Sequence, residues 1–101
     1  MTQATSILEQ LGINLKNEVT IKINDKLDLT FKRDNSAYDE FLNSVTSDNK
    51  LVPTKDYLLA IVKPAQREAL SELLQFSEIA LAIVEKVDSA FKPSFELKIK
   101  N

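Results

Sequence analysis

The chain has 101 residues, of which 44 % are hydrophobic and 28 % charged, and its 13 basic and 15 acidic residues give a net charge of −2. This composition is typical of a folded globular protein, and the length favours a single domain over residues 1–101. The charge pattern lacks the basic excess of nucleic-acid-binding proteins. No apolar run approaches the roughly 20 residues that span a bilayer, and residues 1–12 lack a basic leader, so we expect neither a membrane span nor a signal peptide.

Three residue types on which many active sites depend are missing or scarce. The chain has no histidine and no cysteine, and it has one glycine. Ser–His and Cys–His nucleophile pairs, thiolate metal sites and glycine-rich phosphate loops are therefore excluded. A hydrolase that uses only carboxylates is the weakest alternative, because acids such as Glu68 and Glu72 lie on a polar helix face beside Arg67. We expect no enzyme activity, no metal and no cofactor.

The N-terminal segment, residues 1–12, is expected to be helical over residues 2–11. Ile7, Leu8 and Leu11 share one side of that helix, and Gly12 follows at the position of a left-handed C-cap. A short terminal helix of this kind either docks weakly or serves a partner.

Residues 19–31 change to a period of two and predict a β-hairpin. A three-residue loop, Asn24–Lys26, keeps all apolar residues on one face, because it pairs Ile23 with Leu27, Ile21 with Leu29 and Val19 with Phe31. Such loops usually end in the left-handed region, which conflicts mildly with Lys26 at the last position.

Residues 35–91 carry helical spacing throughout. Ser36 with Asp39 predicts a capping box for the first helix, whose apolar side holds Tyr38, Phe41, Leu42 and Val45. Pro53 and Pro64 are each expected at the first position of a further helix, and Ser77 is expected to cap the last one.

After Pro93, the segment 94–100 alternates Phe95, Leu97 and Ile99 with polar residues and predicts a third short strand. The expected fold is therefore α+β: a small antiparallel sheet, made of the N-terminal β-hairpin and the short C-terminal strand, covered by four to five short amphipathic helices.

Five residues of the helical part are candidates for a protein-binding surface: Pro53, Tyr57, Leu58, Ile61 and Phe76. The reason is that amphipathic helices either build a core or offer an apolar stripe to another helix. For Tyr57 the ordinary alternative is burial with its hydroxyl at the surface. If the stripe binds a partner, charged substitutions of Tyr57 and Ile61 should abolish binding and leave the helix content unchanged.

The run Asp48-Asn49-Lys50-Leu51-Val52-Pro53, followed by Tyr57-Leu58-Leu59 and Val62, resembles the phage tail assembly chaperones found in bacterial prophages. The order of hairpin, helices and terminal segment agrees with that family over about residues 19–100, so that the first helix lies outside the resemblance.

The resemblance implies a non-enzymatic protein of the bacterial cytoplasm that binds the long tape-measure protein during tail morphogenesis. Its exposed apolar surface would be covered by the client or by self-association into a homo-oligomer. Two other classes of binding protein stay open: an adaptor or subunit of a stable complex, and an inhibitor-like protein with a basic target.

Overall fold

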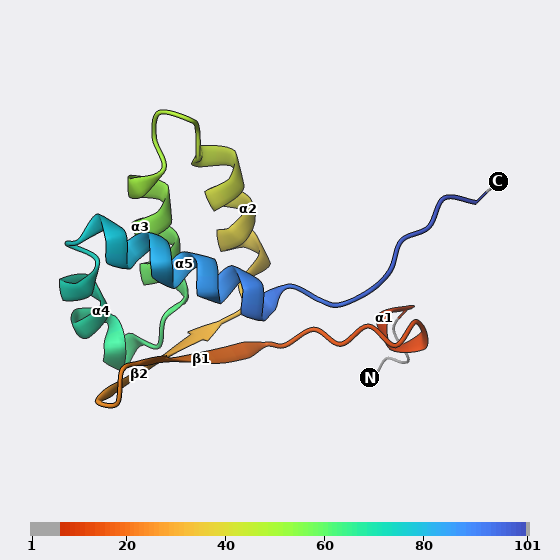
Figure 1. The fold of residues 1–101 in the computed structure, drawn as a ribbon, viewed down its shortest axis with the longest axis horizontal. Helices are drawn as coiled ribbons and strands as arrows, with labels where there is room; N and C mark the ends of the chain where they lie inside the picture. Colours follow the sequence, from red (N-terminus) through yellow and green to blue (C-terminus); the bar gives the residue numbers. More distant parts are fainter. Residues whose placement is uncertain (1–6, 101) are drawn as a thin grey trace.

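The computed structural model describes residues 7–100 and has the mixed α+β architecture expected from the sequence (Figure 1). Helices α3, α4 and α5 lie on one side of a two-stranded antiparallel sheet, and α2 runs beside α3. The elements follow in the order α1 Ile7–Gln10, β1 Glu18–Ile23, β2 Leu27–Lys32, α2 Asn35–Ser44, α3 Leu51–Ile61, the 3₁₀ turn η1 Pro64–Gln66, α4 Arg67–Leu73 and α5 Ser77–Phe91.

The hairpin has the predicted register. Val19 pairs with Phe31, Ile21 with Leu29 and Ile23 with Leu27. The left-handed residue of the loop is Asn24, with φ of 49°, and not Lys26. The Asn24 side chain accepts the backbone N–H of Lys26 at 2.9 Å, so that the expected conflict at Lys26 does not arise.

The N-terminal helix is shorter in the described chain than expected, because α1 covers Ile7–Gln10 and residues 2–6 lie outside the described part. Gly12 follows with φ of +72°, which confirms the left-handed C-cap. No residue of α1 is buried, so this turn of helix contributes nothing to the core.

The capping residues differ by one or two positions from those expected. Asp34, in an extended conformation, precedes α2, and its side chain accepts the N–H of Ala37 at 3.0 Å. Ser36 lies inside the helix, where its hydroxyl cannot take the N-cap role, so the capping box with Asp39 is wrong. Ser77 is likewise the first helical residue of α5, after Phe76 as N-cap.

The two prolines have different roles. Pro64 opens η1 as expected, and α4 follows without a gap. The helix around Pro53 instead begins at Leu51, so that Pro53 is its third residue and Val52 is helical. The N–H groups of the first helical turn have no intrahelical acceptor, and a proline at this position therefore costs no hydrogen bond.

The core lies between the apolar face of the hairpin and the helices above it. Its fully buried large side chains come from β2, α3, α4 and α5, and they are Leu29, Phe31, Leu58, Leu70 and Val87. Helices α3, α4 and α5 thus bring their apolar stripes to one shared interior, as amphipathic helices over a sheet must.

The outer edge of β2 is covered by the connection between α3 and α4. Val62 forms a β-bridge with Phe31, and the N–H of Lys63 donates to the carbonyl of Thr30 at 2.9 Å. The Gln66 side chain accepts the Thr30 N–H at 2.7 Å and donates to the Asp28 carbonyl at 2.9 Å. The backbone groups that point away from β1 are therefore occupied.

The third strand expected over residues 94–100 is not formed, because the segment leaves the helical body after Pro93 and pairs with neither β1 nor β2 (Figure 1). Its apolar side chains stay in solvent: Phe95, Leu97 and Ile99 are 52 %, 83 % and 89 % exposed.

Arg33 fixes the place where this segment departs. Its Nη2 donates to the carbonyl of Phe91 at 2.7 Å, its Nε donates to the carbonyl of Lys16 at 2.7 Å, and its guanidinium lies 4.9 Å from the centre of the Phe91 ring. The end of α5 is thus held beside the start of β1. Charged donors at the last carbonyls of a helix also complement the helix dipole.

Candidate functional site

The structure separates the five candidate residues into two groups. Tyr57, Leu58 and Ile61 are core residues, and Pro53 is also buried. Phe76, at the junction of α4 and α5, is 58 % exposed. Of the five, Phe76 therefore presents substantial apolar surface, while Pro53 and Tyr57 contribute to the walls of surface hollows.

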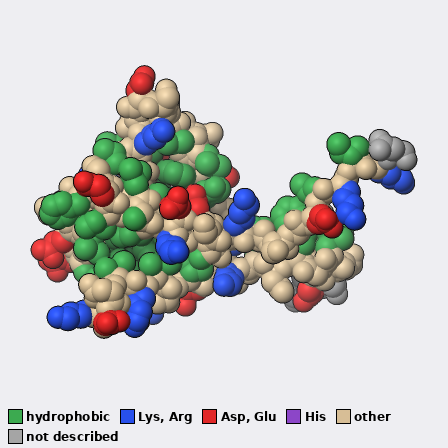
Figure 2. Space-filling view, in the orientation of Figure 1, with side chains coloured by type: hydrophobic (Ala, Val, Ile, Leu, Met, Phe, Trp, Pro, Cys, Tyr) green, Lys and Arg blue, Asp and Glu red, His purple; other side chains and the backbone are tan. Residues whose placement is uncertain are grey.

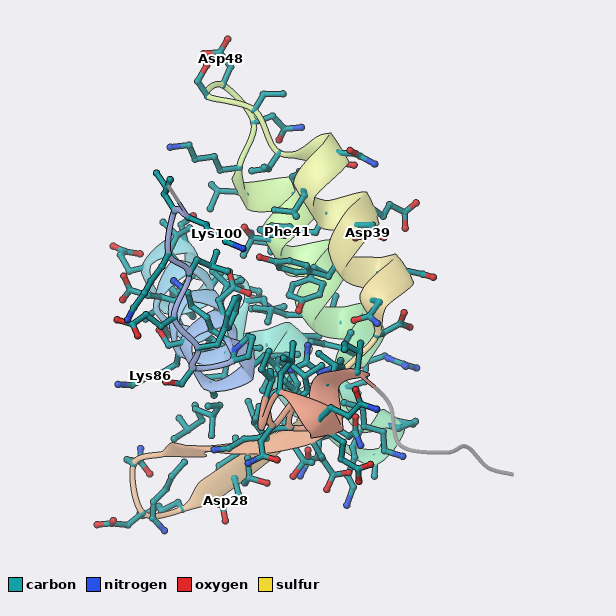
Figure 3. The ribbon with its side chains drawn as sticks, turned by 90° about the vertical axis from the view of Figure 1, so that its right-hand side faces the viewer. Asp28, Asp39, Phe41, Asp48, Lys86 and Lys100 are labelled. Atoms are coloured by element: carbon teal, nitrogen blue, oxygen red, sulfur yellow. The ribbon has the colours of Figure 1, made fainter. Side chains whose placement is uncertain are left out.

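Three aromatic rings lie between these hollows. Phe41 of α2 stacks on Tyr57 of α3, with ring centroids 5.0 Å apart, and Tyr38 lies 6.0 Å from Phe41 and 5.7 Å from Tyr57. Figure 3 shows Phe41 pointing inward from α2. The spacing of three residues puts Tyr38 and Phe41 on the same side of α2, toward α3. Contacts of this kind contribute about 0.5–1.5 kcal/mol each beyond their burial, so they fix the two helices together.

One hollow lies along α2 and α3, and we call it the α2–α3 groove. It has a volume of about 300 Å³. Its lining is divided about evenly between apolar and polar surface and includes two exposed carboxylates; its residues are Ala37, Glu40, Phe41, Ser44, Asn49, Val52, Pro53, Asp56, Tyr57 and Ala60. Val52 is 59 % exposed, which is high for a branched aliphatic residue. Such a groove suits an apolar side chain flanked by basic residues.

The second hollow lies where α5 ends, on the other side of Tyr57. It has a volume of about 350 Å³ and contains both signs of charge next to two tyrosines. Its residues are Arg33, Asp34, Asn35, Tyr38, Tyr57, Asp88, Phe91, Lys92 and Pro93. Within residues 7–100, no three acidic side chains gather closely enough to hold a metal ion. A hollow of this size with mixed charge fits polar contacts of a protein partner.

Burial raises the pKa values of three side chains in this second hollow. It raises the pKa of Tyr57 to about 12, with the negative charge of Asp88 as the next cause, and the same two causes raise the pKa of Tyr38. The pKa of Asp88 is itself raised by burial. Tyrosine hydroxyls are protonated at neutral pH in any case, and the raised pKa values keep these two as hydrogen-bond donors to higher pH.

An alkaline titration should resolve these tyrosines, which are the two of the chain. We expect tyrosinate absorbance to rise above the usual range, with Tyr57 titrating at about 12. Asp88→Asn should lower the pKa of Tyr57 and leave it above 10.0, since burial is the larger cause. Because the unfolded chain releases these protons first, stability should fall as the pH rises from about 10 to about 12. Two tyrosines titrating together near pH 10 would contradict this.

Comparison with known proteins connects this architecture to phage assembly. The sequence profile of the family described as "Phage tail assembly chaperone" matches residues 19–101, from the second residue of β1 to the end of the chain. The chain belongs to the phage tail assembly chaperone family. The match begins after α1, so that the hairpin from Val19 onward, both hollows and the C-terminal segment all lie within it.

A relative in a phage agrees with this membership. The chain is 47 % identical over 100 residues to the "Uncharacterized 11.3 kDa protein in lys 3'region" of Haemophilus phage HP1 (strain HP1c1), which covers 99 % of this chain and 97 % of the relative. No solved protein structure matches the chain. Among the helices of residues 7–100, none combines the length and the apolar character that crossing a bilayer requires.

For a tail assembly chaperone, the apolar surface available to a partner is of first interest. Figure 2 shows hydrophobic side chains gathered over the body formed by α3, α4 and α5. Val52 was not among the candidate binding residues, because a residue before proline is expected to leave the helix, whereas it is the second residue of α3. The signal that could have identified it is the spacing of Val52, Asp56 and Ala60, which places all three on one side of α3, along the groove.

Proposed function

We propose that this chain is a non-enzymatic chaperone of the host cytoplasm that binds the tape-measure protein during tail morphogenesis. The observation that carries the proposal is the family match over residues 19–101. A tape-measure protein is a long helical client with apolar faces, which a chaperone must cover until the tail tube assembles. A small protein that covers them needs apolar surface of its own.

The α2–α3 groove supports this proposal as the surface for the client. Phe41 and Tyr57 form its base, Val52 stands at its wall, and Glu40 and Asp56 give it an acidic rim. An amphipathic client helix would place an apolar residue against the rings and a lysine or arginine near each carboxylate. Phe76, between α4 and α5, offers a second apolar contact.

Co-expression with the tape-measure protein of the same phage tests both parts of the proposal. We expect the chain to increase the soluble fraction of the tape-measure protein and to copurify with it in several copies per client. Val52→Asp replaces an apolar residue of the groove lining with a charge and should weaken binding by about tenfold or more, as loss of a central contact does.

Lys55→Asp is the matched control, because Lys55 lies on the same helix and does not line the groove. If Val52→Asp and Lys55→Asp bind alike, the groove is not the client site. If the unmodified chain neither solubilises nor binds the tape-measure protein, the proposed function is wrong. A single small partner at equal stoichiometry would instead favour an adaptor.

A further inference from the structure

The outer edge of β1 is open. On β2, Asp28 and Thr30 direct their backbone groups away from the partner strand, toward Gln66 and Lys63. Thr20 pairs with Thr30 and Lys22 with Asp28, so the backbone groups of Thr20 and Lys22 point away from β2 on the opposite side. No hydrogen bond in the described part of the chain engages them there. Open edges of this kind bind an additional strand.

The C-terminal segment has the properties of a strand without a sheet. Residues 94–100 run extended away from the helical body (Figure 1), alternate apolar with polar side chains, and expose the apolar ones. The half-buried Ile21 and Ile23 lie at the apolar face of β1, next to its open edge. An added strand there would cover apolar surface on both partners.

The side chains of the two segments match in one orientation. In an antiparallel arrangement that pairs Thr20 with Lys98, every polar residue of β1 faces a compatible partner and every apolar residue faces an apolar one. The pairs are Glu18 with Lys100, Lys22 with Glu96, Val19 with Ile99, Ile21 with Leu97 and Ile23 with Phe95. The parallel arrangement with the same overlap would put Glu18 against Glu96 and Lys22 against Lys100, which is repulsive.

The segment cannot reach this position on its own chain. Arg33 holds Phe91 beside Lys16, at the start of β1, whereas Phe95 must lie opposite Ile23 at the far end. The six residues of β1 extend about 20 Å at about 3.3 Å each. The four residues from Phe91 to Phe95 can span at most about 14 Å. The matching strand must therefore come from another molecule.

We propose that two copies exchange their C-terminal segments, so that residues 94–100 of each add as an antiparallel strand to the open edge of β1 in the other. A two-fold axis between the two added strands places the start of β1 in one copy on the same side as the end of β1 in the other copy. Each C-terminal segment leaves its own chain near the start of β1, so it can begin pairing at the end of β1 in the other copy. The contact is independent of the tape-measure protein and leaves the α2–α3 groove open.

Cysteine pairs test the register directly, because the chain has no cysteine of its own. Residues opposite each other at a hydrogen-bonded position lie about 5.5 Å apart at Cα, which a disulfide spans. We expect the double variant Thr20→Cys/Lys98→Cys to form a covalent dimer on oxidation. The control Thr20→Cys/Glu96→Cys is displaced by two residues and should not, because diagonal neighbours lie about 7–8 Å apart.

A disulfide that closes within one chain, or equal crosslinking of both variants, would overturn the proposal. The proposal would also be overturned if the chain is monomeric by itself and Thr20→Cys crosslinks only to added tape-measure protein. That result would assign the open edge of β1 to the client.

Charge exchange in the full chain gives a second test that needs no oxidation. We expect sedimentation to show twice the 11.4 kDa mass of one chain. Glu96→Lys/Lys100→Glu should raise the dissociation constant of the dimer at least about tenfold, since four attractive pairs become repulsive across two exchanged strands and the segment pairs with no strand of its own chain. Adding Glu18→Lys/Lys22→Glu should restore attraction across the exchanged strands. A monomer at all concentrations, or a dimer insensitive to both changes, would refute strand exchange.

Discussion

Substitution of Ile61 by aspartate is expected to unfold the protein. Ile61 ends α3 with 3 % of its surface exposed and belongs to the buried cluster under the hairpin. A carboxylate at this position would lose its hydration without gaining a partner, which costs several kcal/mol. Because domains of this size are stable by only about 5–15 kcal/mol, a loss of several kcal/mol removes a large part or all of the free energy of unfolding.

The sequence alone suggested a different result, in which charged residues at Tyr57 and Ile61 abolish binding and preserve the helices. The burial of both side chains changes that expectation. Far-ultraviolet circular dichroism and urea unfolding would measure the outcome. Val52→Asp is the matched control, because it introduces the same charge on the same helix at an exposed position. If Ile61→Asp keeps its helix content and its cooperative unfolding, Ile61 does not belong to the core.

The hairpin was predictable in detail because its two constraints agree. A period of two fixes which residues share a face. Burial of that face then requires a loop with an odd number of residues. The order Val19, Ile21, Ile23 and its partners in β2 therefore follow from the sequence. Helix ends were less predictable, since Asp34 and Ser36 are both acceptable caps and the choice between them depends on the path of the chain after β2.

The candidate site was predictable only in part. The stripe that holds Tyr57, Leu58 and Ile61 is apolar whether it faces a core or a partner, and periodicity cannot separate the two. The α2–α3 groove depends on how two helices lie beside each other, so neither helix alone indicates it. The C-terminal segment shows the same limit, because alternation predicts strand character but says nothing about which edge, or which molecule, supplies the neighbour.

Replacement of Phe31 by alanine should cost the most of any truncation within the sheet. Phe31 is fully buried, pairs with Val19, and forms the β-bridge to Val62 that ties the sheet to the end of α3. Removing its ring leaves a cavity enclosed by strands and helices that cannot collapse together. Substitutions of this kind cost about 3–5 kcal/mol.

Phe95→Ala is the control with the same chemistry at a position that is 52 % exposed. Urea unfolding of the monomer at low protein concentration should show a midpoint shift for Phe31→Ala and a change within about 0.5 kcal/mol for Phe95→Ala. At high concentration Phe95→Ala should weaken the dimer, because strand exchange pairs Phe95 with Ile23 of the second copy. Equal effects of the two variants on the monomer would show that the C-terminal segment packs on its own chain, which contradicts both the fold and the exchange.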